Sequence, residues 1–113
     1  MTTLRIEHPI TDYILWKHAF DRFAEMRSAA GVRRHVIRRP VDDPCYVVAD
    51  LDFGSVEEAA AFLDLLRTRV WSQPANSPAL AGDPVTRILV TEEGPVPAAS
   101  RADEAGAPVT TAS

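Results

Sequence analysis

The sequence has a single cysteine, Cys45, among its 113 residues. One cysteine excludes an intrachain disulfide and any zinc site built from several cysteines. The N-terminal segment lacks the basic region and apolar core of a signal peptide, and no apolar run approaches the length of a membrane span. We therefore expect a cytoplasmic protein with no membrane partner.

The sequence also lacks the excess of positive charge that is typical of nucleic-acid-binding proteins. Its net charge is −4 and its pI is about 5.3, so no nucleic-acid partner is predicted. Four arginines do lie close together, but strand geometry would place Arg34 and Arg38 on one face and Arg33 and Arg39 on the other. A charged edge strand that resists edge-to-edge pairing explains them better than an anion site does.

Gly-rich phosphate loops, paired catalytic carboxylates and metal-spaced His/Glu sets are missing, so no metal site is predicted. The C-terminal residues 95–113 have no aromatic side chain and are rich in Pro, Ala and Ser. Such a segment cannot bury enough apolar surface to offset its ordering entropy. We predict one domain over residues 1–94 and a disordered tail over residues 95–113.

What the sequence does contain begins with a strand and an amphipathic helix. Apolar and charged residues alternate from Thr3 to His8, and Pro9 should end that strand because it has no N–H for the ladder. Either Thr11 or Asp12 can cap a helix that runs to about Ala30. Gly31 is the expected stop. The helix carries a stripe at three- and four-residue steps that consists of Tyr13, Trp16, Phe20, Phe23 and Arg27.

The remaining elements complete a βαββαβ order. Strands are predicted at residues 33–39, 45–53 and 85–91, and a helix is predicted from Ser55 to Trp71 because Ser55 and Glu58 form a capping box. The loop at residues 72–84 has room for one helical turn at Pro78–Leu80. This order predicts an α+β ferredoxin-like sandwich in which each helix returns the chain to a parallel neighbouring strand.

Two helices can cover only one face of a four-stranded sheet. The other face should carry Tyr46 and Val48, together with either Leu89 or the pair Ile88 and Val90. A bare apolar face is unusual for a monomer. We therefore expect a homodimer that packs its open sheet faces together, with a ligand cavity between sheet and partner.

The spacing of His8, Asp12 and Trp16 (H-x-x-x-D-x-x-x-W), the segment GVRRHVIRRPVDDPCYVVADLDF and the Ser-capped, Ala-rich helix resemble the dimeric α/β-barrel superfamily over residues 4–92. The sequence is most similar to the small antibiotic-biosynthesis-monooxygenase-like proteins. This resemblance implies a dimer and a cofactor-independent monooxygenase or polyketide cyclase. The haem-degrading branch is disfavoured, because the chain has no Asn before Asn76 and no His after His35.

Two candidate groups follow for the site. His8 could act as a base or a hydrogen-bond donor to a phenol with Asp12 orienting its ring, or the two could form a structural corner. Trp16 fits a core position or a ligand contact, and Trp71 could close a pocket or simply pack.

On the open sheet face, Tyr46 could donate to a substrate oxygen and Asp50 could accept a proton. Asp50 could instead form an ion pair with Arg34 or Arg38 across the sheet. Two functions therefore stay open. One is an enzyme without a cofactor that acts on an aromatic or polyketide-like molecule, and the other is a non-catalytic ligand-binding or accessory dimerisation module.

Overall fold

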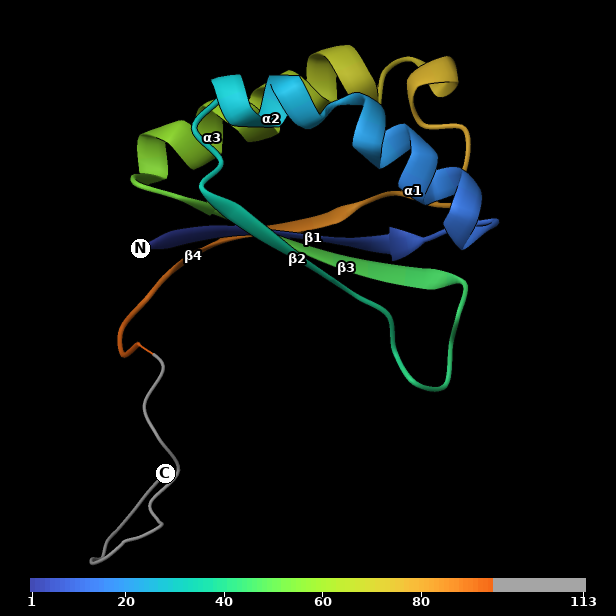
Figure 1. The fold of residues 1–113 in the computed structure, drawn as a ribbon, viewed down its shortest axis with the longest axis horizontal. Coiled ribbons are helices and arrows are strands. Elements are labelled where there is room, and N and C mark those ends of the chain that lie inside the picture. Colours follow the sequence, from blue (N-terminus) through green and yellow to red (C-terminus); the bar gives the residue numbers. More distant parts are fainter. Residues whose placement is uncertain (95–113) are drawn as a thin grey trace, which may run out of the picture.

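The computed structural model describes residues 1–94, and the predicted tail at 95–113 lies outside them. Four strands form one sheet in the order β2-β3-β1-β4, and every neighbouring pair is antiparallel. All helices lie on one face of this sheet (Figure 1), which confirms the α+β ferredoxin-like sandwich. The strands are β1 (Thr2–Pro9), β2 (Arg34–Arg38), β3 (Tyr46–Phe53) and β4 (Val85–Val90).

The predicted parallel neighbours are wrong. The strands that a helix connects do run parallel, but another strand separates them: β3 lies between β1 and β2, and β1 lies between β3 and β4. Pro9 is the last residue of β1, as predicted, and it pairs with Tyr46 in the ladder. Its carbonyl still accepts from the backbone N–H of Ala81, 3.2 Å away, and an isolated bridge joins Ile10 to Leu80. Proline lacks only the donor, so the acceptor side of the ladder continues through it.

The first predicted helix is divided in two. Helix α1 (Tyr13–Arg22) and helix α2 (Ala24–Ala29) meet at Phe23, whose φ of −100° and ψ of 18° leave the helical region. Asp12 is the cap, since its carboxylate accepts from the N–H of Leu15 at 2.8 Å. Gly31 ends α2 with φ of 99°, as its position predicts. The aromatic stripe continues across the break, so periodicity alone could not reveal it.

Helix α3 (Val56–Leu65) begins at the predicted capping box. The hydroxyl of Ser55 accepts from the N–H of Glu58 at 3.2 Å, and the Glu58 carboxylate accepts from the N–H of Gly54 at 3.1 Å. The helix continues into a wide π-helical turn, η1 (Leu66–Val70), in which the N–H of Trp71 donates to the carbonyl of Leu66 at 2.7 Å. Such turns are frequent at functional sites.

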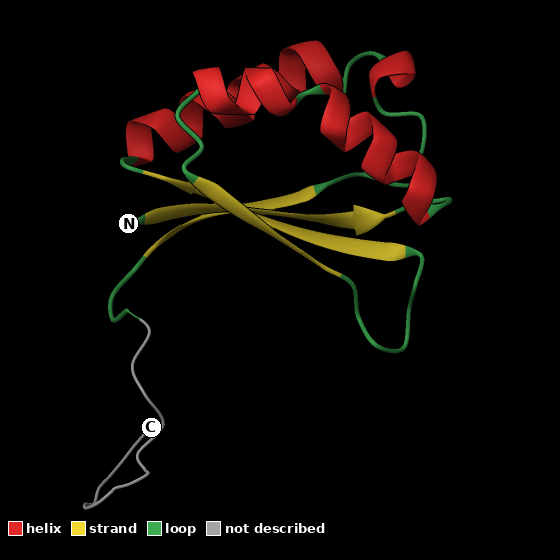
Figure 2. Cartoon of the chain, viewed as in Figure 1, coloured by secondary structure: helices red, strands yellow, loops and turns green. Residues whose placement is uncertain are grey.

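In the following loop, the helical turn is η2 (Pro74–Asn76) rather than the predicted Pro78–Leu80. Figure 2 shows this short helix beyond the end of the longer helical run. Leu80 instead forms the bridge to Ile10, and the preceding residue in the loop, Ala79, is 1% exposed. The loop is therefore anchored against the end of β1 by backbone bonds, one of which joins the N–H of Thr11 to the carbonyl of Ala79 at 2.9 Å.

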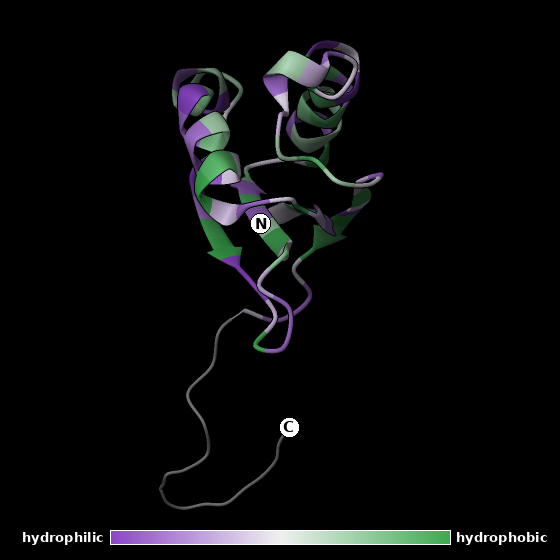
Figure 3. Ribbon diagram, turned by 90° about the vertical axis from the view of Figure 1, so that its right-hand side faces the viewer, coloured by the Kyte–Doolittle hydropathy of each residue, from purple (hydrophilic) through white to green (hydrophobic). Residues whose placement is uncertain are grey.

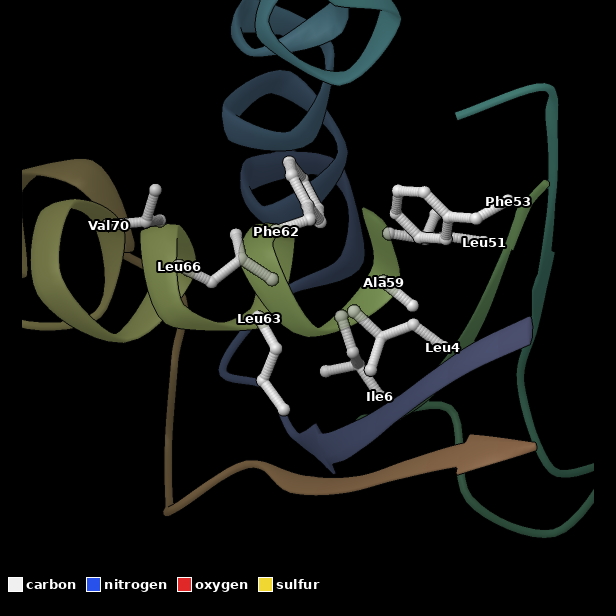
Figure 4. Close-up of a cluster of buried hydrophobic side chains, with 9 residues drawn as sticks. All are labelled: Leu4, Ile6, Leu51, Phe53, Ala59, Phe62, Leu63, Leu66 and Val70. Atoms are coloured by element: carbon white, nitrogen blue, oxygen red, sulfur yellow. The ribbon is translucent and has the colours of Figure 1, made fainter. Parts of the chain in front are cut away.

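The core lies between the sheet and α3. Leu4 and Phe53 are fully buried, and Leu51 is 1% exposed. Figure 4 shows how side chains from β1 and β3 point towards those of α3 and η1. The second helical column contributes five side chains to this buried core: Ala59, Phe62, Leu63, Leu66 and Val70.

Within residues 1–94, no helix lies over the other face of the sheet (Figure 1), and the helices stand as two columns above the opposite face (Figure 3). Leu89, rather than Ile88 or Val90, points to the open face, since it pairs with Thr3 while Ile88 pairs with the buried Leu4. No helix within residues 1–94 is both long enough and apolar enough to cross a membrane.

Candidate functional site

A cavity of about 80 Å³ lies between the helices and the covered face of the sheet. Its position differs from the expected cavity between the sheet and a partner, because α1 and α3 stand apart enough to leave a space between them. Its walls are mainly apolar and aromatic, and they come from β1, β3, both helical columns and the loop after η1. The residues that line the cavity include His8, Trp16, Phe20, Arg27, Trp71 and Asn76.

His8 is the titratable group of the sheet that reaches this cavity. It is 4% exposed, and burial, which disfavours the charged imidazolium, lowers its pKa despite the opposing hydrogen bond to Pro9. Nδ1 lies 2.9 Å from the carbonyl oxygen of Pro9. A carbonyl can only accept, so Nδ1 carries the proton of the neutral ring and Nε2 is left as an acceptor. His8 therefore has the form that a general base requires.

Trp16 forms an aromatic wall beside His8. The two ring centroids are 6.4 Å apart, and Trp16 stacks on Phe20 with centroids at 5.0 Å and an angle of 22° between the planes. Trp16 is half-buried, so it packs against its neighbours and also borders the cavity. Its flat face is suited to contact with an aromatic ligand.

Trp71 lines the same cavity from the other helical column. The π-helical turn places it directly after Val70, at the point where the chain leaves the helix for the loop. Asn76, in η2, also borders the cavity, and its amide nitrogen donates to the carbonyl of Arg69 at 2.9 Å. Its side-chain oxygen is the remaining acceptor of that amide. The placement of Trp71 agrees with the pocket alternative.

Sequence reasoning missed Arg27 as a site residue. Arg27 is 7% exposed and lines the cavity, although arginine is almost never fully buried without a partner. Burial lowers its pKa, and the charge of Asp21 only partly opposes this. The signal was present, because Arg27 occupies a position on the aromatic stripe where an apolar side chain would be expected.

Three predicted site residues do not line the cavity. The carboxylate of Asp12 caps α1 and makes no hydrogen bond to His8, so Asp12 neither orients the His8 ring nor forms a structural corner with it. Trp16 is the candidate residue that lies beside His8. Tyr46 and Asp50 lie on the open sheet face, as expected. The hydroxyl of Tyr46 donates to Glu7 at 2.9 Å, and this bond raises its pKa.

Asp50 forms an ion pair instead of reaching a cavity. It accepts two hydrogen bonds from the guanidinium of Arg5, at 2.8 and 2.9 Å, and one from Arg38 at 3.1 Å. The expected pairing with Arg38 is thus present, and Arg34 pairs with the neighbouring Asp52. With both oxygens occupied by guanidinium donors, Asp50 is poorly placed to act as a base.

Within the part of the chain that the structure describes, no three His, Cys, Asp or Glu side chains gather as metal ligands would. The groups that border the cavity include one imidazole, one guanidinium, one amide and several aromatic rings. Such a set can accept a proton, stabilise an anion and hold a flat apolar ligand.

Comparison with solved structures identifies the fold. SnoaB, a cofactor-independent oxygenase from Streptomyces nogalater, superposes with a TM-score of 0.63 at 14% identity, covering 82% of this chain and 94% of that one. The chain has the fold of the antibiotic-biosynthesis-monooxygenase-like proteins. A protein from Nitrosomonas europaea that is provisionally named an antibiotic biosynthesis monooxygenase superposes with a TM-score of 0.62 at 18% identity, over 82% of this chain and all 100% of that one.

A dimeric ferredoxin-like protein from an uncultured marine organism also shares this monooxygenase-like fold, with a TM-score of 0.59, 12% identity, and coverage of 81% of this chain and 97% of that one. No protein-family model matches the sequence, and no curated protein sequence matches it. The likeness therefore rests on the fold, since the identities are low throughout.

Proposed function

We propose that this protein binds a small aromatic molecule in the cavity between α1, α3 and the sheet, and that His8 removes a proton from it. The observation that carries this proposal is the state of His8: a buried, neutral ring whose Nδ1–H is held by Pro9 and whose Nε2 has no hydrogen-bond partner within residues 1–94. A buried acceptor without a partner costs free energy unless a ligand supplies a donor. A phenol or an enol is such a donor.

The proposed reaction is a cofactor-independent monooxygenation. SnoaB is named a cofactor-independent oxygenase, and the Nitrosomonas europaea protein is provisionally named a monooxygenase. A methylene flanked by aromatic rings and activated by a carbonyl loses one proton to His8 and becomes an enolate. The enolate then reduces dioxygen. In the net reaction CH₂ becomes C=O, one oxygen atom enters that carbonyl, and the other leaves as water with the two hydrogens. The protein supplies the base and a site that excludes water.

The size of the cavity favours a ligand that inserts one ring. Typical ligand pockets measure about 300–1,000 Å³, whereas this cavity measures about 80 Å³. A polyketide-like substrate with several fused rings would require Trp16 or Trp71 to move outward. A cavity of this size also fits a second function, in which the protein binds a small aromatic ligand without turnover, as a binding or accessory module. A cyclase would use His8 as the base in the same way.

We further propose that the protein is a homodimer through the open sheet face. The support is the absence of any helix over this face within residues 1–94, together with three apolar side chains that it exposes, Val36, Val85 and Leu89. The dimeric ferredoxin-like neighbour shares the fold. The ion pairs of Asp50 and Asp52 lie on the same face and would become less hydrated in such a dimer.

The two tryptophans of the sequence provide the test, because both line the cavity. The protein gives two indole N–H signals by ¹⁵N NMR, and Trp16→Phe assigns them. Titration with phenol, 2-naphthol and anthrone should shift both signals and raise the melting temperature. Oxygen uptake with anthrone then separates the functions. Uptake that His8→Asn abolishes supports the oxygenase, binding without uptake supports the binding module, and unchanged indole signals with all three probes would refute the site.

A further inference from the structure

Arg27 is a buried positive charge with little to balance it. It is 7% exposed, and none of the ion pairs formed within residues 1–94 includes it. The nearest acidic influence is Asp21, which is on the protein surface and is paired with Lys17 at 2.6 Å. Buried guanidinium groups are normally paired with an anion, because an isolated buried charge is costly.

Most of the hydrogen-bond donors of Arg27 also lack acceptors. One Nη1–H donates to the carbonyl of Phe20, and the guanidinium carbon lies 3.6 Å from the centre of the Phe20 ring. A guanidinium has five N–H donors. Among the described residues, no acceptor serves the other four. If Arg27 only capped the end of α1, this role would explain one of its N–H donors and the stacking on Phe20. It would not explain why the other four donors are buried without acceptors within residues 1–94.

A ligand in the cavity could supply the acceptor that the N–H donors of Arg27 lack. Arg27 lines it, and no Asp or Glu does. Because the pKa of His8 is lowered, the guanidinium is the charged group of an otherwise apolar wall. An anion that entered would find no competing carboxylate and little water, and both conditions strengthen a charge-assisted hydrogen bond.

We propose that the ligand of this cavity is an aromatic acid, whose carboxylate is bound by the fork of Arg27 while its ring lies against the aromatic wall. A carboxylate matches the paired donors of a guanidinium in geometry and charge. This inference rests on the proposed function, since it names the chemical class of ligand for the same cavity. His8 then receives a proton from a hydroxyl or an activated carbon on the same ring system.

The test compares two ligands of nearly equal shape, 3-hydroxybenzoate and 3-hydroxybenzamide, with phenol as a third probe. Calorimetric titration of the full-length protein should give an affinity for the acid at least about tenfold above that for the amide, as expected for a hydrogen-bonded charge pair. In Arg27→Met the ratio of the two affinities should fall to about one. In Arg67→Met, which removes an exposed arginine outside the cavity wall, the ratio should stay as in the wild type.

A second measurement, made on the wild-type protein, does not depend on how well Arg27→Met folds. In the wild-type protein, the Nε–H signal of Arg27, assigned by its loss in Arg27→Lys, should shift with the acid and stay in place with the amide. Equal affinities for acid and amide in the wild type, or a preference that survives Arg27→Met, would overturn this inference and leave the aromatic site standing. Failure of all three probes to bind would overturn the site and this inference together.

Discussion

The Nδ1 atom of His8 lies 2.9 Å from the carbonyl oxygen of Pro9, the next residue in β1. This contact orients the ring and selects the tautomer with the proton on Nδ1, because the carbonyl cannot donate. The interaction that holds His8 is therefore local to the end of one strand, and it leaves Nε2 available on a ring that borders the cavity.

His8→Ala should remove the response to phenolic probes at a small cost in stability. The Pro9 carbonyl keeps its bond from Ala81, so the variant leaves no buried group without a partner. The free energy of unfolding should fall by about 1 kcal/mol, while the ligand-induced rise in melting temperature should vanish. His18→Ala, at an exposed position of α1, is the control. A loss of several kcal/mol with binding intact would instead mark His8 as a structural corner.

The stability of the protein should fall as the pH drops below about 6.5. The pKa values of His8 and His35 are both lowered in the folded protein, mainly by burial. The unfolded chain therefore takes up protons first, near the ordinary pKa of about 6.5, and the stability that the neutral rings confer is lost until the folded-state pKa is reached.

Thermal melts at pH 7.5 and pH 5.5 measure this loss. We expect His8→Asn to show a smaller decrease in melting temperature between the two pH values than the wild type shows. His35→Asn should have a lesser effect, since His35 is much less buried than His8 and loses less of its hydration on folding. An unchanged decrease in His8→Asn would contradict the assignment of His8 as a buried neutral ring.

Asp50→Asn should weaken the fold and spare ligand binding. Asp50 joins β3 to both Arg5 of β1 and Arg38 of β2, on the sheet face opposite the cavity. Because both arginine side chains are largely hydrated, we expect a loss of about 1 kcal/mol in the free energy of unfolding. Denaturant melts and probe titrations measure both effects, with the exposed Asp64→Asn as the control. Loss of binding in Asp50→Asn would mean that Asp50 acts on the ligand after all.

Leu89→Lys should dissociate the proposed dimer. Leu89 is 38% exposed and points to the open sheet face, so a dimer through this face would bury the added charge in its interface. Sedimentation should give twice the 12.4 kDa chain mass for the wild type and for Val41→Lys, a change at a turn position that is fully exposed. A wild-type protein that sediments as a monomer at micromolar concentration would rule out the dimer.

The local pattern of the sequence was enough to predict the fold class and the order of the elements, but it did not predict which strands are neighbours. The alternation in β1 and β3, the capping box at Ser55 and the glycine at position 31 each depend on contacts between residues a few positions apart, and such contacts are written in the sequence. The order of these elements then allows few topologies. The same patterns indicated His8, Trp16 and Trp71 as candidate site residues.

Only the tertiary structure decided which of these residues lie together around the cavity. The cavity lies on the helical face because residues as distant as Ile6, Trp71 and Asn76 come together there, and no periodicity encodes the space that they leave between them. The buried Arg27 donates to the carbonyl of Phe20, next to the break at Phe23, and periodicity does not reveal that break. The removal of Asp50 from the site depends on Arg5, in another strand. Packing across the whole chain sets which polar groups are paired, and the unpaired ones define the site.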